Sequence, residues 1–396
     1  MAEIPWGNNS DLDDSQFYNR ENELYFLHNI LNTTKDGIPP AILLTGVRGV
    51  GKTALMKKLR NDFCNDYLVV YVDLSMSDNY QSGNLTREGF MEHYYDEIIR
   101  ACKDAGLKTI DKKLKKFIKT NDLSIGDIVD FEGVPLPIVS AKENYKKLAD
   151  FVMNLPQMIY EEYSDDIKGV LVFFDEFQVI KDLDKDLNSF LWYVRGFVQS
   201  QKNTAYMFTG SMSLKDSLIG EIAGKNGAFG GRILTYELEA FSYDTTRNYL
   251  IEKAGHLRFS ESGFERFYKC TGGIPFYINS FARLLSHEEI LDEKKLSSEF
   301  KNALPFLAIH LISYWDKLTF QEQKVITALV DGPQRRVRIA EKLNVTSGAI
   351  GGSLNSLQDK ALIEMDDGKY KISDSIFRSW LKSEFERKGV YPYRSF

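Results

Sequence analysis

The 396-residue sequence predicts an α/β fold, a doubly wound parallel sheet of five strands, followed by a helical lid and a C-terminal winged helix-turn-helix. A glycine-rich turn after an apolar run predicts the first strand–helix unit, and a second apolar run that ends in two carboxylates predicts a central strand. A helix-rich tail that closes with a short hairpin predicts the winged helix. We expect domains at 1–240, 241–310 and 311–396, with an insertion at about 101–147.

The first unit carries the motif G-x-x-x-x-G-K-[ST], directly after the apolar run Ala41–Thr45. Glycine leaves backbone N–H groups unobstructed and tolerates positive φ, so such a loop wraps a phosphate chain; an ordinary glycine turn is the alternative. We expect Lys52 to reach the β- and γ-phosphates of ATP, and Thr53 to ligate Mg²⁺ at the N-terminus of the next helix. The predicted nucleotide-binding residues are Gly46, Val47, Arg48, Gly49, Val50, Gly51, Lys52, Thr53 and Ala54.

The second apolar run, Val170–Phe174, ends in Asp175 and Glu176. An entirely apolar strand fits the centre of a parallel sheet, whose C-terminal edge is where ligands bind. Asp175 is predicted to hold the Mg²⁺ shell and Glu176 to polarise the attacking water as general base; a solvated strand end is the alternative. With the intervening strand Leu68–Asp73, the pattern indicates the P-loop ATPases that have an added strand and a catalytic glutamate.

A fourth strand, Ala205–Thr209, leads into Ser211. A hydroxyl at this strand end would lie between the two phosphate-site motifs and could report the γ-phosphate, and we assign this role to Ser211 before Thr209. Either residue could instead cap the following helix.

The fifth predicted strand, Arg232–Leu238, follows the glycine-rich stretch Gly224–Gly231. Flexible glycine before an arginine suggests that Arg232 is an arginine finger, acting within the chain or from a neighbouring copy. A planar, permanently charged guanidinium suits the charge of a phosphoryl-transfer transition state. An ordinary surface arginine is the alternative.

Two further stretches, residues 17–24 (Phe-Tyr-Asn-Arg-Glu-Asn-Glu-Leu) and Thr271–Pro275, follow the order of motifs in a known family. With them the chain resembles the archaeal-type ATPases of the STAND class, relatives of the AAA+ origin-recognition and loader ATPases. The resemblance implies that Arg20 lies near the adenine and that Pro275 of the lid packs beside the base. Asn19 replaces the family's glycine, and Asn also tolerates left-handed backbone geometry. The resemblance also makes Arg283 a candidate second sensor.

Residues 241–305 have the pattern of short amphipathic helices, which we interpret as a lid that converts phosphate state into relative orientation. In the tail, helices over 319–330, 336–343 and 347–360 and a hairpin over 361–372 predict a winged helix. The insertion is expected to hold a basic helix over 111–119 and a hairpin over 127–139.

Charge gives a weak indication of partners. The net charge is −6, made of +3 over residues 311–396 and −9 elsewhere. The start of the third tail helix lacks Arg and Lys, while Arg335, Arg336 and Arg338 could grip the phosphates of double-stranded DNA. Packing of the winged helix on the ATPase core is the rival interpretation. No signal-like or membrane-spanning stretch is evident, so we expect a cytoplasmic protein with no membrane partner.

These observations predict an ATP-driven switch that binds ATP and ADP and hydrolyses ATP slowly. The expected output is regulated protein assembly, with a homo-oligomer in the ATP state and an unidentified protein partner. The alternative is an ATP-dependent DNA-binding initiator or regulator, or a loader.

Overall fold

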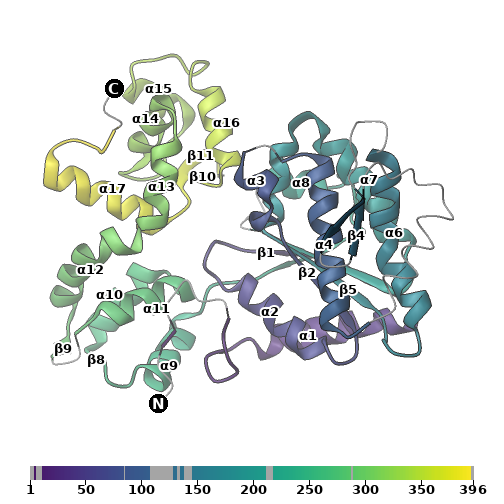
Figure 1. The fold of residues 1–396 in the computed structure, drawn as a ribbon. Coiled ribbons are helices and arrows are strands. Elements are labelled where there is room, and N and C mark those ends of the chain that lie inside the picture. The colour runs from purple at the N-terminus through teal and green to yellow at the C-terminus, as the bar shows by residue number, and fades with distance from the viewer. Residues whose placement is uncertain are drawn as a thin grey trace.

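The computed structural model describes residues 4–5, 11–83, 85–107, 128–131, 134–137, 145–210, 217–286 and 289–393. The described chain forms two bodies that lie side by side (Figure 1). We call residues 11–240 the sheet body and residues 241–393 the C-terminal body. Within the described part of the chain, every helix is too short or too polar to span a bilayer.

The described residues of the sheet body form one parallel five-stranded sheet, in the order β2-β5-β6-β1-β7, which confirms the predicted α/β fold. The first four strands match the predicted apolar runs closely, and the fifth is shorter than predicted at both ends. The strands are β1 Ala41–Thr45, β2 Leu68–Asp73, β5 Val170–Asp175, β6 Thr204–Thr209 and β7 Leu234–Glu237.

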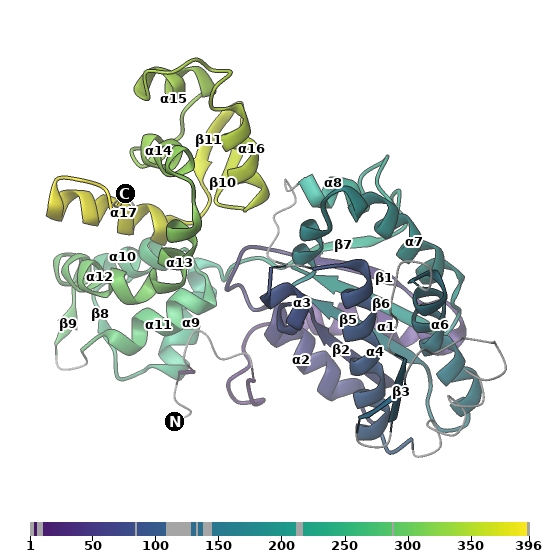
Figure 2. The ribbon, with the colours of Figure 1, turned by 45° about the horizontal axis from the view of Figure 1, so that its top comes forward.

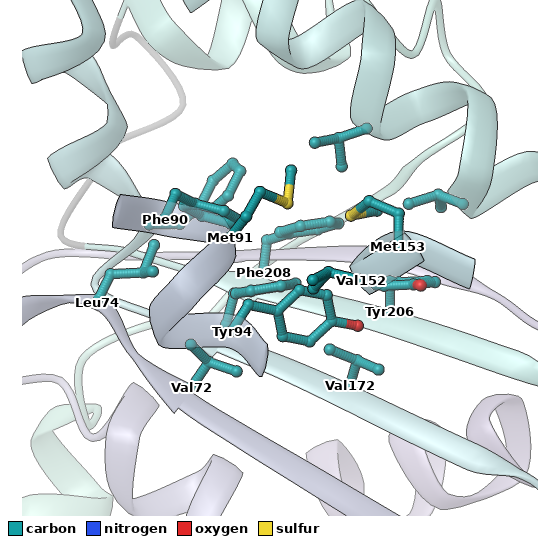
Figure 3. Close-up of a cluster of buried hydrophobic side chains, with 14 of the residues drawn as sticks. Val72, Leu74, Phe90, Met91, Tyr94, Val152, Met153, Val172, Tyr206 and Phe208 are labelled. Carbon is teal, nitrogen blue, oxygen red and sulfur yellow. The ribbon is translucent and has the colours of Figure 1, made fainter. Parts of the chain in front are cut away.

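Side chains alternate between the two faces along each strand, and both faces carry apolar residues, so helices cover both faces of this sheet. Ile42 and Leu44 of β1 pack in the cluster that includes Leu27 and Leu55, whereas Leu43 joins the cluster on the opposite face. On that opposite face, Phe90, Met91 and Tyr94 lie over Val172, Tyr206 and Phe208 of the central strands (Figure 3). The helices of this body are α1 Glu21–Asn32, η1 Thr33–Asp36, α2 Lys52–Phe63, η2 Leu74–Met76, α3 Asp78–Gln81, α4 Arg87–Asp104, α6 Tyr145–Tyr163, η3 Phe177–Asp186, α7 Leu187–Ser200 and α8 Ser217–Ala223.

The insertion contains β3 Ile128–Phe131, paired antiparallel with β4 Val134–Pro137, which confirms the predicted hairpin. The predicted basic helix over 111–119 lies outside the described residues.

The C-terminal body is mainly helical (Figure 2). A single hydrophobic cluster of the described residues contains Ile4 and side chains from Phe241 to Leu381, and it includes Trp315, which is only 1% exposed. The predicted lid and the predicted winged helix therefore share one core. The elements are α9 Tyr243–Lys253, β8 Arg258–Phe259, α10 Glu261–Thr271, α11 Pro275–Leu284, β9 Ile290–Leu291, α12 Glu293–Leu307, α13 Ile309–Lys317, α14 Phe320–Leu329, α15 Arg336–Lys342, α16 Gly351–Asp359, β10 Ile363–Asp366, β11 Lys369–Ile372 and α17 Ser375–Lys388.

Three helices and a hairpin follow the predicted order in the tail, and β10 pairs antiparallel with β11. The third helix is shorter than predicted, since α16 begins at Gly351 and not at residue 347. Turn hydrogen bonds occupy the preceding residues: Ala349 N–H donates to the Thr346 carbonyl, and Gly351 N–H donates to the Gly348 carbonyl.

Candidate functional site

The glycine-rich loop between β1 and α2 has the backbone geometry of a phosphate cradle. Gly46, Gly49 and Gly51 have φ values of 138°, 81° and 104°, which residues with a Cβ rarely adopt. A Cβ on Gly46 would lie 2.6 Å from the Leu238 carbonyl oxygen, so this position is also sterically restricted to glycine. Because α2 begins directly after Gly51, its free N–H groups and its positive end are available to an anion.

Lys52 is the first residue of α2 and is 7% exposed. Its Nζ donates hydrogen bonds of 2.8 Å to the Gly46 carbonyl and 3.0 Å to the Val47 carbonyl. Burial lowers the pKa of Lys52 to about 8, and the nearby carboxylates of Glu176 and Asp175 oppose this effect. The side chain is therefore a poorly solvated ammonium at the phosphate loop, well suited to bind an anion.

Asp175 ends β5 and is 2% exposed. One carboxylate oxygen accepts a 2.7 Å hydrogen bond from the Tyr71 hydroxyl, and the other accepts a 2.8 Å bond from the Glu176 N–H. Burial raises the pKa of Asp175, while hydrogen bonds from Tyr71 and from the Thr53 side chain act in the opposite direction. The structure thus brings Thr53 and Asp175 together, and a hydroxyl beside a carboxylate is an oxygen donor set that fits Mg²⁺.

Glu176 follows Asp175 with φ 53° and ψ 37°, a left-handed conformation that is uncommon outside glycine. Its side chain accepts a hydrogen bond from Gln178 Nε2. Strained backbone of this kind costs about 1–3 kcal/mol and is often found at functional sites. The carboxylate lies close enough to Lys52 to affect the lysine's pKa, so the structure brings it to the same site.

The hydroxyl expected at the end of β6 is present in Thr209. Thr209 follows Phe208, which pairs with Phe174, so it lies beside Asp175 in the sheet. Its Oγ1 is buried and has no hydrogen-bond partner among the described residues. Ser211, our first assignment, lies outside the described residues. Thr209, the sequence-based alternative to Ser211, is therefore a described residue with a buried hydroxyl at this strand end, and its contact with the γ-phosphate stays a prediction.

Arg20 is 7% exposed and lies between the phosphate loop and the C-terminal body. Its guanidinium donates to the Val50 carbonyl at 3.1 Å and to the Glu239 carbonyl at 2.8 Å, and it lies 5.0 Å from the ring centroid of Phe241. Asn19 has φ 51°, so its backbone adopts the left-handed geometry expected at the position where it replaces the family's glycine. Arg20 thus holds the loop against the connection between the bodies, and its contact with adenine stays a prediction.

Pro275 is the first residue of α11, and the next residue contacts the phosphate loop. Phe276 N–H donates a 3.1 Å hydrogen bond to the Gly49 carbonyl, and a Cβ on Gly49 would lie 2.6 Å from Phe276 Cβ. The lid therefore packs directly on the loop. Contact between Pro275 and the base stays a prediction. The second-sensor role of Arg283 also stays a prediction; in this structure its Nε donates a hydrogen bond to the Ile4 carbonyl.

Two further hydrogen bonds, between residues far apart in the sequence, join the sheet body to the tail, and neither was predicted from the sequence. Arg48 of the phosphate loop donates a 2.6 Å hydrogen bond to the Tyr314 hydroxyl, and its guanidinium lies 5.4 Å from that ring's centroid. Lys181, on the segment after Glu176, donates a 2.7 Å bond to the Asp359 carbonyl at the end of α16. The phosphate loop and the segment that follows Glu176 thus both contact the C-terminal body.

The within-chain role considered for Arg232 is wrong. Arg232 precedes β7, whose register with β1 runs from Leu234 opposite Ile42 to Glu237 opposite Thr45. Because the strands are parallel and the phosphate loop follows the end of β1, Arg232 lies at the opposite edge of the sheet. It is exposed and donates a 3.3 Å hydrogen bond to Gln199. Action on a neighbouring copy stays a prediction.

The parallel sheet, the glycine loop and the paired carboxylates define a P-loop nucleotide-binding protein. Residues 17–281 match the family described as an ATPase domain predominantly from Archaea, and the chain belongs to this family. An uncharacterized ATP-binding protein of Methanocaldococcus jannaschii is 26% identical over 170 residues, which make up 42% of this chain and 40% of that protein. The match thus spans less than half of this relative's length.

Two solved structures have a similar fold. A Walker-type ATPase of Pyrococcus abyssi aligns with a TM-score of 0.63 and 18% identity, over 94% of this chain and 99% of that one. The ORC2 protein of Aeropyrum pernix, solved as ADPNP–ADP complexes, aligns with a TM-score of 0.52 and 12% identity, over 96% and 98% of the two chains.

Proposed function

We propose that this chain is an ATP-driven molecular switch of the STAND type, which hydrolyses ATP slowly and uses nucleotide state to place its winged-helix module and regulate protein assembly. One observation carries the proposal. Adjacent residues of the phosphate loop, Arg48 and Gly49, are hydrogen-bonded to Tyr314 and Phe276 of the C-terminal body. A change in the loop on nucleotide exchange therefore acts on the second body without any intermediary.

The residues of the site have distinct expected roles. Lys52 binds the β- and γ-phosphates, and Thr53 with Asp175 would hold Mg²⁺, which neutralises charge on the phosphates when bound. Glu176 accepts a proton from the attacking water. Gln178 Nε2 donates to one oxygen of the Glu176 carboxylate and so helps to orient the group that would accept the proton.

The surroundings of Arg48 extend the coupling into the C-terminal body. Tyr277 of α11 donates a 2.5 Å hydrogen bond to Asp374, which also caps the N-terminus of α17. Burial raises the pKa of Asp374, and the hydrogen bonds from Tyr277, Phe377 and Ile376 oppose this rise, with a smaller contribution from the positive charge of Arg48. Tyr277, two residues after Pro275, therefore joins α11 to the cap of the last helix, and Arg48 adds a weaker electrostatic effect there.

The switch can be tested by attaching fluorophores to exposed positions in the two bodies and measuring energy transfer with ADP and with a non-hydrolysable ATP analogue. We expect different transfer efficiencies for the two nucleotides in the parent chain. Tyr314→Ala removes the hydroxyl and the ring that contact Arg48, so it should abolish the difference while both nucleotides still bind.

Tyr25→Ala is the matched control, since Tyr25 lies on α1 and is 73% exposed. This variant should behave as the parent. Identical transfer with ADP and with the analogue in the parent chain would reject the switch, because nucleotide state would then leave the two bodies in one arrangement.

The DNA-binding alternative has one supporting observation: Arg335, Arg336 and Arg338 are all exposed around the start of α15. However, Arg336 Nε donates to the Ser347 carbonyl at 2.7 Å, and Arg338 pairs with Glu341 at 2.8 Å. A gel shift that depends on ATP and weakens with salt would favour DNA binding by an initiator, regulator or loader. A nucleotide-dependent increase in mass without DNA would favour assembly.

A further inference from the structure

Tyr71 lies two residues before the end of β2, the strand beside β5. The parallel register places Tyr71 opposite Phe173 and Asp73 opposite Asp175. Since alternate residues share a face, Tyr71 and Asp175 lie on the same side of the sheet, about 7 Å apart along the strand direction. The tyrosine side chain spans this distance, and its hydroxyl donates the 2.7 Å hydrogen bond to Asp175 Oδ2.

Asp73, the direct neighbour of Asp175 in the register, has a different role. Its carboxylate accepts hydrogen bonds from the N–H and the hydroxyl of Ser75 and so caps η2. Tyr71 is therefore the residue of β2 whose side chain donates to Asp175.

Donors of different kinds hold the Asp175 carboxylate, and one of them, the Thr53 hydroxyl of α2, is itself expected to ligate the ion. The N–H that bonds Oδ1 belongs to the adjacent residue, Glu176, and moves with the same strand end. The Tyr71 hydroxyl comes from another strand, 104 residues earlier in the sequence. It therefore fixes the rotation of the carboxylate relative to the sheet from a residue that, unlike Thr53, is not itself an expected ligand of the ion.

We propose that Tyr71 is a positioning residue for Mg²⁺, which holds the Asp175 carboxylate in the orientation that completes the ion's ligands with Thr53. This inference rests on the proposed nucleotide-binding function. Partners that orient a metal-ligating side chain typically contribute about 10–100-fold to metal affinity. Because the Tyr71 hydroxyl bonds the carboxylate, its removal should weaken only the Mg²⁺-dependent part of nucleotide binding.

The test compares Tyr71→Phe with Tyr67→Phe. Tyr67 immediately precedes the same strand, is 3% exposed, and its hydroxyl bonds Asn32 Oδ1 at 3.2 Å, far from the carboxylates. Each change deletes one hydroxyl and keeps the ring, so the control also reports the structural cost of the change. Binding of a non-hydrolysable ATP analogue to the full chain is measured by calorimetry, with EDTA and over a series of Mg²⁺ concentrations.

We expect the parent and Tyr67→Phe to gain the same factor in affinity from Mg²⁺. Tyr71→Phe should lose about tenfold of this gain and need correspondingly more Mg²⁺ for half-maximal binding, with unchanged affinity in EDTA. An unchanged Mg²⁺ dependence would overturn the positioning role, and so would an equal loss in EDTA, which is the mark of a structural effect. Failure of the parent chain to bind the analogue would instead overturn the proposed function.

Discussion

The interiors of the two bodies and the seam between them are built from different interactions. Each face of the sheet is covered by an apolar cluster, and the C-terminal body has an apolar core of its own. The seam is mixed: it contains the hydrogen bonds of Arg48 and Lys181, the contact of Phe276 on Gly49, the Arg20 guanidinium over the Phe241 ring, and edge contacts of Tyr18 with Phe241 and Tyr249. Two of the seam residues, Arg48 and Gly49, belong to the phosphate loop.

This difference indicates where the molecule can change shape. Burying a large apolar side chain contributes about 1.5–3 kcal/mol, and a core contains dozens of them. A hydrogen bond contributes about 0.5–1.5 kcal/mol net, because water replaces it when it breaks. The bodies should therefore move as units, while a few polar contacts at the seam exchange when the loop binds a different nucleotide.

The largest expected effect is inside the sheet body. Glu176→Gln keeps the shape of the side chain but removes its ability to take a proton, so turnover should fall by roughly 10²-fold or more while ATP still binds. Steady-state phosphate release and calorimetry measure the two quantities. Glu161→Gln, an exposed change on α6, is the control.

If the seam follows nucleotide state, Glu176→Gln should also keep the two bodies in their ATP arrangement after ATP is added, whereas the parent should return to the ADP arrangement. Hydrolysis at the parent rate would show that Glu176 is not the base.

A smaller effect is expected for Lys52→Ala, which removes the ammonium that faces the phosphates. ATP affinity should fall by about tenfold or more, because one side of a charge pair is lost. Lys57→Ala on the same helix is the control, since Lys57 pairs with Asp11 outside the loop. Calorimetry checks the prediction, and an unchanged affinity would defeat the phosphate-loop assignment.

The residues that were predictable from the sequence are those whose chemistry is local. The apolar runs gave four strands closely, and the glycine spacing gave the loop, because backbone geometry there depends on a few adjacent residues. The seam was not predictable: Arg48 and Tyr314 are 266 residues apart, and Tyr71 and Asp175 are 104 apart. Neither pair leaves a periodic or spacing signal.

Arg232 illustrates a different error. Its place after a glycine-rich stretch suggested an arginine finger. However, Arg232 precedes β7, the phosphate loop follows β1, and these neighbouring strands are parallel, so the two lie at opposite edges of the sheet. Strand direction, already implied by the predicted parallel sheet, excluded the within-chain role. The shared core of the lid and tail was also missed, since an amphipathic pattern shows that a face is buried without showing its partner.

The smallest predicted effect concerns stability inside the C-terminal body. Glu322, 3% exposed in α14, accepts 2.6 Å hydrogen bonds from Ser356 of α16 and from Lys360 directly after it, and it also accepts a hydrogen bond from the Thr319 N–H. Burial raises the pKa of Glu322, but the hydrogen bonds from Lys360, Ser356 and Thr319 outweigh it and lower the pKa to about 2. Glu322→Gln should therefore destabilise this body by about 1–3 kcal/mol at pH 7.

The sign of the pH dependence follows from the lowered pKa. Stabilisation by ionised Glu322 is complete above its ordinary pKa of 4.5 and is lost as pH falls towards about 2. The difference in unfolding free energy between parent and variant should thus be widest near neutral pH and shrink below pH 4.5. Urea unfolding followed by tryptophan fluorescence measures it, since Trp315 and Trp380 lie in this body. Glu341→Gln, in an exposed pair with Arg338, should cost under about 1 kcal/mol, and an equal loss there would show that the buried network adds nothing to this body.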